Sequence, residues 1–465
     1  MDQILFSLGR RPRLLLALIL LGLPFFPSSA QGEYSLLSRL IIDYNIRALS
    51  SSLTEGSYHG EEGILRILPE AARSLGMKVL INEDYKAAKS QLKRAQTALE
   101  RAKKHMSSNR NELAPGYHTR RILEEFLRYR ESIESARARF LSYRQKLNPG
   151  VDDRLNREIA AKAMEKLFQR CLKETGYSLR DALGRFFNFC LEPGDKQATL
   201  TTENISFVNE IFRRYVATAP PELLAGLDLD RDLDHADPIK PRPWKRLLKR
   251  EGFAFASELE SAFEKFKDRE HPVDPLLFLA LMRRESRFDP RAVSSVGAVG
   301  LTQIMHQTAR RLGMKSLFVP PYLDKALDLH RKARRQRQQA MEALFMIHTG
   351  DDLRHAREAR NLMQRSLELE KKKDRLFKKY RHELLDGKKD DRLVPSRAIE
   401  FGLMYFSRLL RAQEGDISLA LASYNAGPHR VKEYGGIPPF AETVHFRNQV
   451  LRYYREYLQK MKGLM

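Results

Sequence analysis

Two long stretches of the N-terminal region carry apolar residues that recur by alternating threes and fours. Such heptad spacing is typical of helices that pack along one stripe. The first seam is Tyr85, Ala88, Leu92, Ala95, Leu99, Ala102 and Met106, and the second is Ile122, Phe126, Tyr129, Ile133, Ala136, Phe140, Tyr143 and Leu147. Ala114-Pro-Gly116 between them indicates a turn. We predict an antiparallel coiled-coil hairpin, with a homodimeric coiled coil and a docking arm for another protein as alternatives.

A shorter helical pattern runs from Asp274 to Pro290, with Asp274 as N-cap and Pro275 in the first turn. Steps of three, four and seven place Glu285 on one face with Phe278, Leu281, Met282 and Phe288. A carboxyl group against apolar walls has its protonated form favoured, which suits a general acid. An inward glutamate that pairs with an arginine or a helix N-terminus is the other interpretation.

The rest of the chain divides into further helical and linking segments. Residues 153–217 read as helices, and a charged, proline-rich stretch without periodicity follows up to Pro243, which predicts an interdomain linker. Trp244 comes next, and we expect it to pack at a domain edge. Residues 317–392 are rich in Arg, Lys, Gln and Glu and predict a third helical arm. No repeat of the solenoid type occurs.

The net charge and the N-terminal segment indicate the cellular compartment in which the protein acts. The 465 residues suffice for two or three domains, and a net charge of +23 indicates nucleic acid, anionic lipid or an acidic wall polymer as surroundings. Arg10, Arg11 and Arg13 precede the apolar run Leu14 to Phe26, and small residues follow up to Ala30. This N-terminus resembles a secretory signal peptide, with an uncleaved anchor as the alternative. We therefore expect no nucleic acid partner and a place outside the cytoplasm.

Cys171 and Cys190 are the only two cysteines in the sequence. In an oxidising compartment a pair nineteen residues apart predicts a disulfide between two helices, with two free buried thiols as the alternative. No CxxC or mixed Cys/His cluster occurs, so we predict no metal site, and nothing in the sequence indicates a cofactor.

Neutral hydrogen-bonding groups cluster in two later segments. Residues 292–305 are rich in glycine, and Ser294 and Gln303 there suit ligands with amide and hydroxyl groups, such as N-acetyl sugars. Tyr424 and Asn425 stand just before Gly427 and Pro428 at the end of a predicted helix that begins at Asp416, a position suited to lining a cleft.

Four ordered segments carry a family resemblance. They are Glu285-Ser286, Gly300-Leu-Thr-Gln-Ile-Met305, Ala422-Ser-Tyr-Asn-Ala-Gly427 and Glu442-Thr443. Together they resemble the signature motifs of the soluble lytic transglycosylase family, whose catalytic domain is lysozyme-like. The resemblance covers about 251–317 and 393–460. Thr302 and His306 depart from the usual Met and Pro, and the long insertion leaves the substrate range and regulation open.

The resemblance implies a reaction and a set of roles. The substrate is the peptidoglycan glycan strand, and the cleaved bond is the β-1,4 link from N-acetylmuramic acid to N-acetylglucosamine, with a 1,6-anhydromuramoyl product. Glu285 is the single acid and base. Ser286, Ser294 and Gln303 are cleft hydrogen-bonding groups, Met305 is a wall, and Tyr424 with Asn425 orient the acid and the N-acetyl group. Asp289, beside Pro290, has a capping or turn role.

The expected fold is mostly α, with an N-terminal helical region that bears the antiparallel coiled-coil hairpin and a C-terminal lysozyme-like domain with an inserted helical arm. The expected segments are 1–30 (signal peptide), 31–150 (hairpin region), 151–218 (helical region), 219–250 (linker) and 251–465 (transglycosylase domain, insertion about 317–392). Expected partners are peptidoglycan strands, envelope proteins through the arms and the membrane surface, in the periplasm or envelope. The rivals are a hydrolytic lysozyme and a non-enzymatic envelope scaffold.

Overall fold

The structure, a computed structural model, describes residues 36–108, 116–176, 178–191, 199–220, 244–250, 253–266 and 272–462. The first half contains α1 (Leu36–Glu55), α2 (Pro69–Ser74), α3 (Glu83–Ser107), α4 (Tyr117–Gln145), the 3-10 turn η4 (Asp153–Leu155), α5 (Arg157–Glu174), α6 (Leu179–Leu191) and α7 (Ile205–Thr218). The described residues form isolated β-bridges and no sheet, so the prediction of a mostly α fold is confirmed.

The second half follows the predicted linker. It contains α9 (Trp244–Arg250), α10 (Ala256–Lys265), α11 (Pro275–Ser286), α12 (His306–Leu312), α13 (Pro321–Phe345), α14 (Leu353–Leu385), η5 (Asp391–Leu393), α15 (Pro395–Ala412), α16 (Ile417–Ala426), α17 (Pro428–Tyr434) and α18 (Ala441–Lys462). Trp244 packs against Phe263 at the edge of this half, as expected, with ring centroids 5.7 Å apart.

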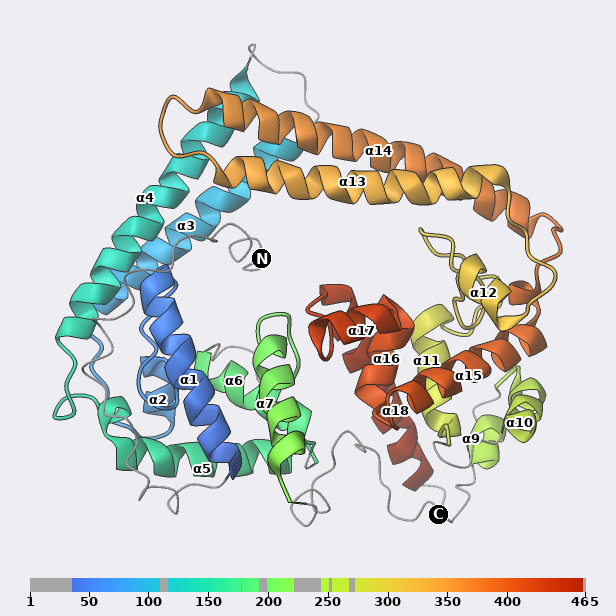
Figure 1. Cartoon of the computed structure of the whole chain (residues 1–465), viewed down its shortest axis with the longest axis horizontal. Helices are drawn as coiled ribbons and strands as arrows, with labels where there is room; N and C mark the ends of the chain where they lie inside the picture. Colours follow the sequence, from blue (N-terminus) through green and yellow to red (C-terminus); the bar gives the residue numbers. More distant parts are fainter. Residues whose placement is uncertain are drawn as a thin grey trace.

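Helices α3 and α4 lie side by side as an antiparallel pair (Figure 1). The small residues of the α3 seam, among them Ala88, Ala95 and Ala102, are buried and let the larger side chains of α4, such as Phe126 and Phe140, approach closely. The turn at Ala114 and Pro115 lies outside the described residues, and the coiled-coil winding stays a prediction.

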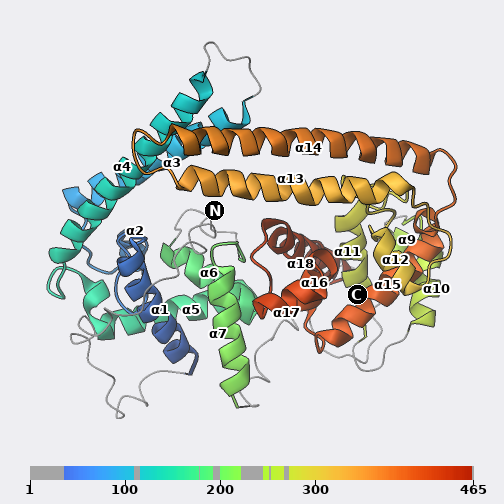
Figure 2. The same cartoon turned by 45° about the horizontal axis from the view of Figure 1, so that its top comes forward.

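The inserted arm is a second long hairpin, α13 and α14, and its end meets the α3–α4 hairpin (Figures 1 and 2). Phe126 and Phe345 pack edge to face with centroids 5.3 Å apart. Arg130 Nη1 donates to the Ile347 carbonyl at 2.9 Å, and Gln364 Nε2 donates to the Met106 carbonyl at 2.8 Å. Each arm therefore rests on the other one.

The two halves repeat one order of elements. The series α1, α2, α3, α4, η4, α5 and α6 corresponds to α11, α12, α13, α14, η5, α15 and α16. The sequence repeats in the same register: Ala72-Arg-Ser-Leu-Gly-Met-Lys78 returns as Ala309-Arg-Arg-Leu-Gly-Met-Lys315, and Asp152-Asp-Arg-Leu155 returns as Asp390-Asp-Arg-Leu393. The N-terminal half is thus a second copy of the fold that carries Glu285.

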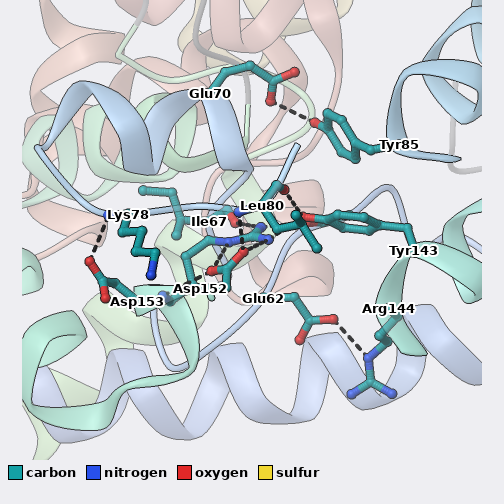
Figure 3. Close-up of polar contacts among 12 residues, drawn as sticks. Glu62, Ile67, Glu70, Lys78, Leu80, Tyr85, Tyr143, Arg144, Asp152 and Asp153 are labelled. Carbon is teal, nitrogen blue, oxygen red and sulfur yellow. Dashed lines mark hydrogen bonds and ion pairs between the residues drawn. The ribbon is translucent and has the colours of Figure 1, made fainter. Parts of the chain in front are cut away.

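A buried arginine closes the base of each arm in the same way. Arg154 Nη1 donates to the carbonyls of Gly60 (2.7 Å) and Ile67 (3.0 Å), and its Nε donates to Asp152 (Figure 3). The equivalent Arg392 donates from Nε to Asp390 and from Nη1 to Gly297 (3.5 Å) and Ile304 (3.3 Å). Each guanidinium also donates to a tyrosine, Tyr143 or Tyr380. This shared network supports the correspondence independently of sequence identity.

Buried ion pairs join the halves where α6 meets α16 and α18. Arg447 donates to Asp181 Oδ1 at 2.5 Å and Arg455 to Asp181 Oδ2 at 2.7 Å, while Arg180 binds both oxygens of Asp416 at 2.8 and 2.7 Å. These arginines hold the pKa of Asp181 at about 2 against the opposing effect of burial. One apolar cluster spans α1, α2, α5, α6 and α7 and extends to Ala422, Val431, Ile437 and Val444 of the second half.

The predicted disulfide is absent from the structure, in which Cys171 and Cys190 are both free and buried. Both thiols lie in the apolar cluster of the first half, where a cysteine packs as a small hydrophobic residue. Burial raises the pKa of Cys171 to about 11 and raises the pKa of Cys190 well above its ordinary value, so both stay protonated and react slowly with oxidants.

The predicted signal peptide 1–30 and residues 221–243 of the predicted linker lie outside the described residues, and the domain boundaries stay predictions. Among the helices that the structure describes, none combines the length and apolarity that crossing a bilayer requires.

Thiol titration tests the correction to the cysteine pair. Without reductant, we expect the folded protein to react slowly with a thiol reagent and the denatured protein to react at both cysteines. A denatured, unreduced protein that shows no reactive thiol would contain the disulfide.

The link between the halves can be tested by Asp181→Ala. This change removes the carboxylate from the buried Arg447, and loss of one member of a buried pair destabilises by about 3–5 kcal/mol. Asp43→Ala is the matched control, because Asp43 forms half-exposed pairs with Arg47 and Arg214 that contribute less than about 1 kcal/mol. Urea unfolding at pH 7 measures both; equal effects would contradict a structural role for Asp181.

Candidate active site

Helix α11 carries Glu285, and hydrogen bonds fix the N-terminus of this helix. Asp274 caps the helix by accepting from Leu276 N at 2.7 Å, and Tyr454 Oη donates to its other oxygen at 2.7 Å. The helix ends at Ser286, and Arg287 turns the chain with a positive φ of 54°. The helix predicted from Asp274 onward is confirmed, and Glu285 stands in its last turn.

The surroundings of Glu285 favour its neutral form. Burial of the carboxyl raises its pKa to about 8, Arg284 lowers this value and the charge of Glu442 raises it further. No described residue donates a hydrogen bond to the Glu285 carboxylate, and no arginine or lysine among them forms an ion pair with it. The alternative of an inward glutamate held by an arginine therefore lacks its partner, and the group keeps the properties of a general acid near neutral pH.

The glycine-rich segment folds into a turn next to α11. Ser286 Oγ donates to the Leu301 carbonyl at 2.9 Å, and Ser294 Oγ accepts from Ala298 N at 2.9 Å. Both predicted cleft serines thus engage the backbone of the turn, and Ser286 is buried. Their contacts with the backbone shape the turn, and their contacts with a ligand stay a prediction.

Gln303 and Met305 occupy the exposed side of this turn and are both partly exposed. Gln303 has a left-handed backbone with φ of 47°, and its Nε2 donates to the carbonyls of Ala292 (3.1 Å) and Gly300 (2.9 Å). These bonds fix the side chain of Gln303 without a ligand. Met305 begins α12 as its N-cap residue.

Helix α16 brings Tyr424 and Asn425 to the same region. Tyr424 Oη donates to the Thr302 carbonyl at 2.7 Å, and its ring lies parallel to Phe446 with centroids 6.4 Å apart. Burial and the nearby charge of Glu285 raise the pKa of Tyr424 well above its ordinary value. Asn425 Oδ1 accepts from Thr443 Oγ1 at 2.8 Å. Tyr424 therefore lies near the acid, but its hydrogen bond goes to the turn.

Several residues that the sequence left without a role support this site. Thr302 is buried and joins the turn to both Tyr424 and α15, because its Oγ1 donates to the Ala398 carbonyl at 2.9 Å. Thr443 fixes Asn425, and Glu442 acts on the acid by charge. The motif Glu442-Thr443 was the available signal for the last two. Asp289 has the expected turn role, accepting from Arg291 N at 2.8 Å.

The N-terminal copy has lost the same constellation. Asn45 Nδ2 donates to the Ile64 carbonyl as Ser286 donates to that of Leu301, so Tyr44 stands where Glu285 stands. Arg66 replaces Gln303 with the same positive φ, 48° against 47°. Phe186 replaces Tyr424: its ring lies 6.0 Å from Phe168, as Tyr424 lies 6.1 Å from Phe406. The first copy keeps the fold and lacks the acid.

A metal site has no ligand set in the described part of the chain, where no three His, Cys, Asp or Glu side chains gather around a point.

Comparison with known proteins points to one family. Residues 262–328 and 369–445 match the family model of the transglycosylase SLT domain, and these segments contain Glu285, Gln303, Tyr424 and Glu442. The break at 329–368 falls within α13 and α14 and is shorter than the predicted insertion of 317–392.

Two solved structures have a distant likeness to the whole chain. One is an inactive mutant of the lytic transglycosylase Slt from Pseudomonas aeruginosa, 16% identical with a TM-score of 0.27, covering 92% of this chain and 72% of that one. The other is the 70 kDa soluble lytic transglycosylase Slt70 from Escherichia coli, 14% identical with a TM-score of 0.26, covering 92% of this chain and 52% of that one. The chain thus spans about half the length of Slt70. TM-scores of 0.27 and 0.26 are too low to establish a shared overall fold.

The identification rests on the domain match and on the site that it covers. The matched segments are the ones that meet around the desolvated carboxyl of α11, and they enclose the signature motifs in order. The chain contains the transglycosylase SLT domain of the soluble lytic transglycosylase family, and this domain indicates a lytic transglycosylase that acts on peptidoglycan.

Proposed function

We propose that the enzyme cleaves the β-1,4 bond between N-acetylmuramic acid and N-acetylglucosamine without water and leaves a 1,6-anhydromuramoyl end. The observation that carries this proposal is the lone, desolvated Glu285 with a pKa of about 8. In its neutral form Glu285 protonates the glycosidic oxygen as the C1–O bond breaks. The resulting carboxylate then takes the proton of the muramoyl C6 hydroxyl, whose oxygen bonds to C1, and the acid is regenerated.

A hydrolytic lysozyme on this fold is the rival reaction, and it needs a second carboxylate to activate water or to act as nucleophile. Asp289 is engaged in its turn. Glu442 is exposed in the first turn of α18, and its charge reaches Glu285. Glu442 is thus the residue on which a hydrolytic reaction would depend, and the mass of the product separates the two reactions.

The cleft residues receive adjusted roles in this proposal. Gln303 and Met305, both partly exposed on the turn, line the cleft on one side, and Tyr424 and Asn425 line it on the α16 side. Ser286 and Ser294 hold the turn in shape through backbone contacts. The N-acetyl group would meet the amide of Asn425, which Thr443 already orients.

The site of action follows from the substrate. Peptidoglycan lies outside the cytoplasmic membrane, so we propose a periplasmic or envelope location reached through the N-terminal segment 1–30. The net charge of +23 would concentrate the enzyme near acidic wall peptides and lipid headgroups. Envelope proteins that dock on the arms remain proposed partners.

Mass spectrometry of muropeptides tests the reaction. Purified sacculi treated with the mature chain should release 1,6-anhydromuramoyl products, and Glu285→Gln should lower their yield by about 10²-fold to 10⁴-fold or more. The variant should be at least as stable as wild type at pH 8, because it removes an unfavourable buried charge. Products with reducing ends would establish hydrolysis instead.

The pH profile tests the state of the acid. Glu285 must be protonated to donate a proton to the glycosidic oxygen. We therefore expect kcat/KM to be constant below about pH 7 and to fall as the pH rises through about 8. Glu442→Gln removes a charge that raises the pKa of Glu285, so its profile should fall at a lower pH. Arg284→Met should move the fall to a higher pH. A wild-type profile that falls near pH 4–5, where an ordinary glutamate titrates, would contradict the assignment.

A further inference from the structure

The N-terminal copy has a pocket at the base of its arm, away from the position of the lost acid. The pocket has a volume of about 380 Å³ and is lined by Glu62, Leu141, Arg144, Gln145, Leu147 and Leu155. Glu62 lies in the β-bridge that precedes α2, and the other lining residues lie in the last turns of α4, just after α4, and in η4. Figure 3 shows Glu62 and Arg144 close to Asp152, which binds the buried Arg154.

Glu62 is the unusual member of this lining, because it is 2% exposed and acidic. Its Oε1 accepts from Tyr58 Oη at 2.6 Å. The same oxygen accepts from Arg144 Nε at 2.8 Å (Figure 3). Its Oε2 accepts no hydrogen bond from any described residue. A carboxylate oxygen that lines a pocket can accept a hydrogen bond from a donor on a ligand.

The catalytic copy shows that the fold does not require this acid. Val299 stands where Glu62 stands, since Val299 pairs with Ile304 in the same bridge that joins Glu62 to Ile67. Val299 is completely buried in an apolar cluster. The same bridge is therefore formed with a valine in one half and a glutamate in the other, so the bridge itself does not require the charge of Glu62.

Two of the other five lining residues also differ between the copies. By the register of the two copies, Arg144, Leu147 and Leu155 are shared as Arg381, Leu384 and Leu393. Leu141 and Gln145 stand where the catalytic copy has Lys378 and His382. The N-terminal copy thus combines Arg144 with the carboxylate of Glu62 and has an apolar residue, Leu141, where the catalytic copy has a lysine. Leu141 is 41% exposed.

We propose that this pocket binds a zwitterionic amino acid group, such as the free amine-and-carboxylate end of a diamino acid in a peptidoglycan stem peptide. The ammonium donates to Glu62 Oε2, and the carboxylate accepts from the Nη atoms of Arg144, which donate to no described residue. Leu141, Leu147 and Leu155 cover the methylene chain between this end and the peptide. The choice of a wall peptide rests on the proposed function.

Charge separates this ligand class from simpler ones. Glu62 and Arg144 already form an ion pair through Oε1 and Nε, so the atoms left for a ligand are one acceptor, Glu62 Oε2, and the donors of the Arg144 Nη atoms. A group that carries both an ammonium and a carboxylate, at the spacing of one amino acid, complements this acceptor and these donors together. The N-terminal copy would then hold the peptides of the strand that the second copy cleaves.

Isothermal titration calorimetry on the full mature chain tests the proposal. The probe is a synthetic N-acetylated stem tetrapeptide with diaminopimelate at its third position, and the comparison peptide carries lysine there, which lacks the second carboxylate. We expect the diaminopimelate peptide to bind at least about tenfold more tightly, as one charge-assisted hydrogen-bonded pair is gained. Equal binding of the two peptides, or no binding of either, would overturn the proposal.

Matched variants locate the binding. Glu62→Gln and Arg144→Met should each weaken binding by about tenfold or more, whereas Arg381→Met, at the equivalent position of the catalytic copy, should not change it. If Glu62→Gln folds poorly, Tyr58→Phe with Glu62→Val provides the apolar joint of the catalytic copy. Undiminished binding by these variants would overturn the site. Cleavage of peptide-free glycan by all variants should equal that of wild type, so a failure of the proposed reaction would show separately.

Discussion

Two buried arginines, Arg154 and Arg392, fix the base of each helical arm against the turn that it packs on. Each closes the point where an arm leaves and returns, and each binds backbone carbonyls of the preceding turn and an aspartate two residues before it. Burial of such charges is unfavourable unless every donor is satisfied. The close fit leaves no space: a Cβ at Gly300 would lie 1.8 Å from the Arg392 carbonyl. The turn that carries Gln303 is therefore fixed against the end of the arm, and the long insertion does not displace it from Tyr424.

The two copies separate what the fold needs from what the chemistry needs. Residues shared by both, such as Gly63 with Gly300 and Tyr143 with Tyr380, belong to the joint at the base of the arm. Residues that differ mark function: the acid of one copy is an aromatic residue in the other, and the buried valine of one joint is a carboxylate in the other. The first copy also supports the second directly, because Arg180 binds Asp416, the residue that caps α16 and so positions Tyr424 and Asn425.

Much of the site was predictable from sequence because its signals are local. The cap at Asp274, the proline at its first turn and the inward face of Glu285 all act within one helix, and their structure agrees with the prediction. The predicted disulfide was wrong, because spacing along the chain does not reveal that both thiols lie in an apolar core. The backbone contacts of Ser286 and Ser294 were not predictable either, since a sequence shows a hydroxyl group but not which backbone atoms it meets. The duplication is visible in the sequence as two short motifs repeated about 237 residues apart, although much of the rest of the two copies has diverged.

The sequence by itself determined the helical character, the two hairpin arms, the family motifs and the position of Glu285 as the candidate acid, because periodicity, capping and short motifs act over a few residues. Only the tertiary structure decided that the N-terminal half is a second, acid-less copy, that Asp181 and Arg447 join the copies, and that Glu62 faces a pocket with a free carboxylate oxygen. Those features depend on groups distant in sequence that share a desolvated space. The pKa of Glu285 belongs with them: its position was readable in the chain, but its value of about 8 arises from the walls that other helices bring around it.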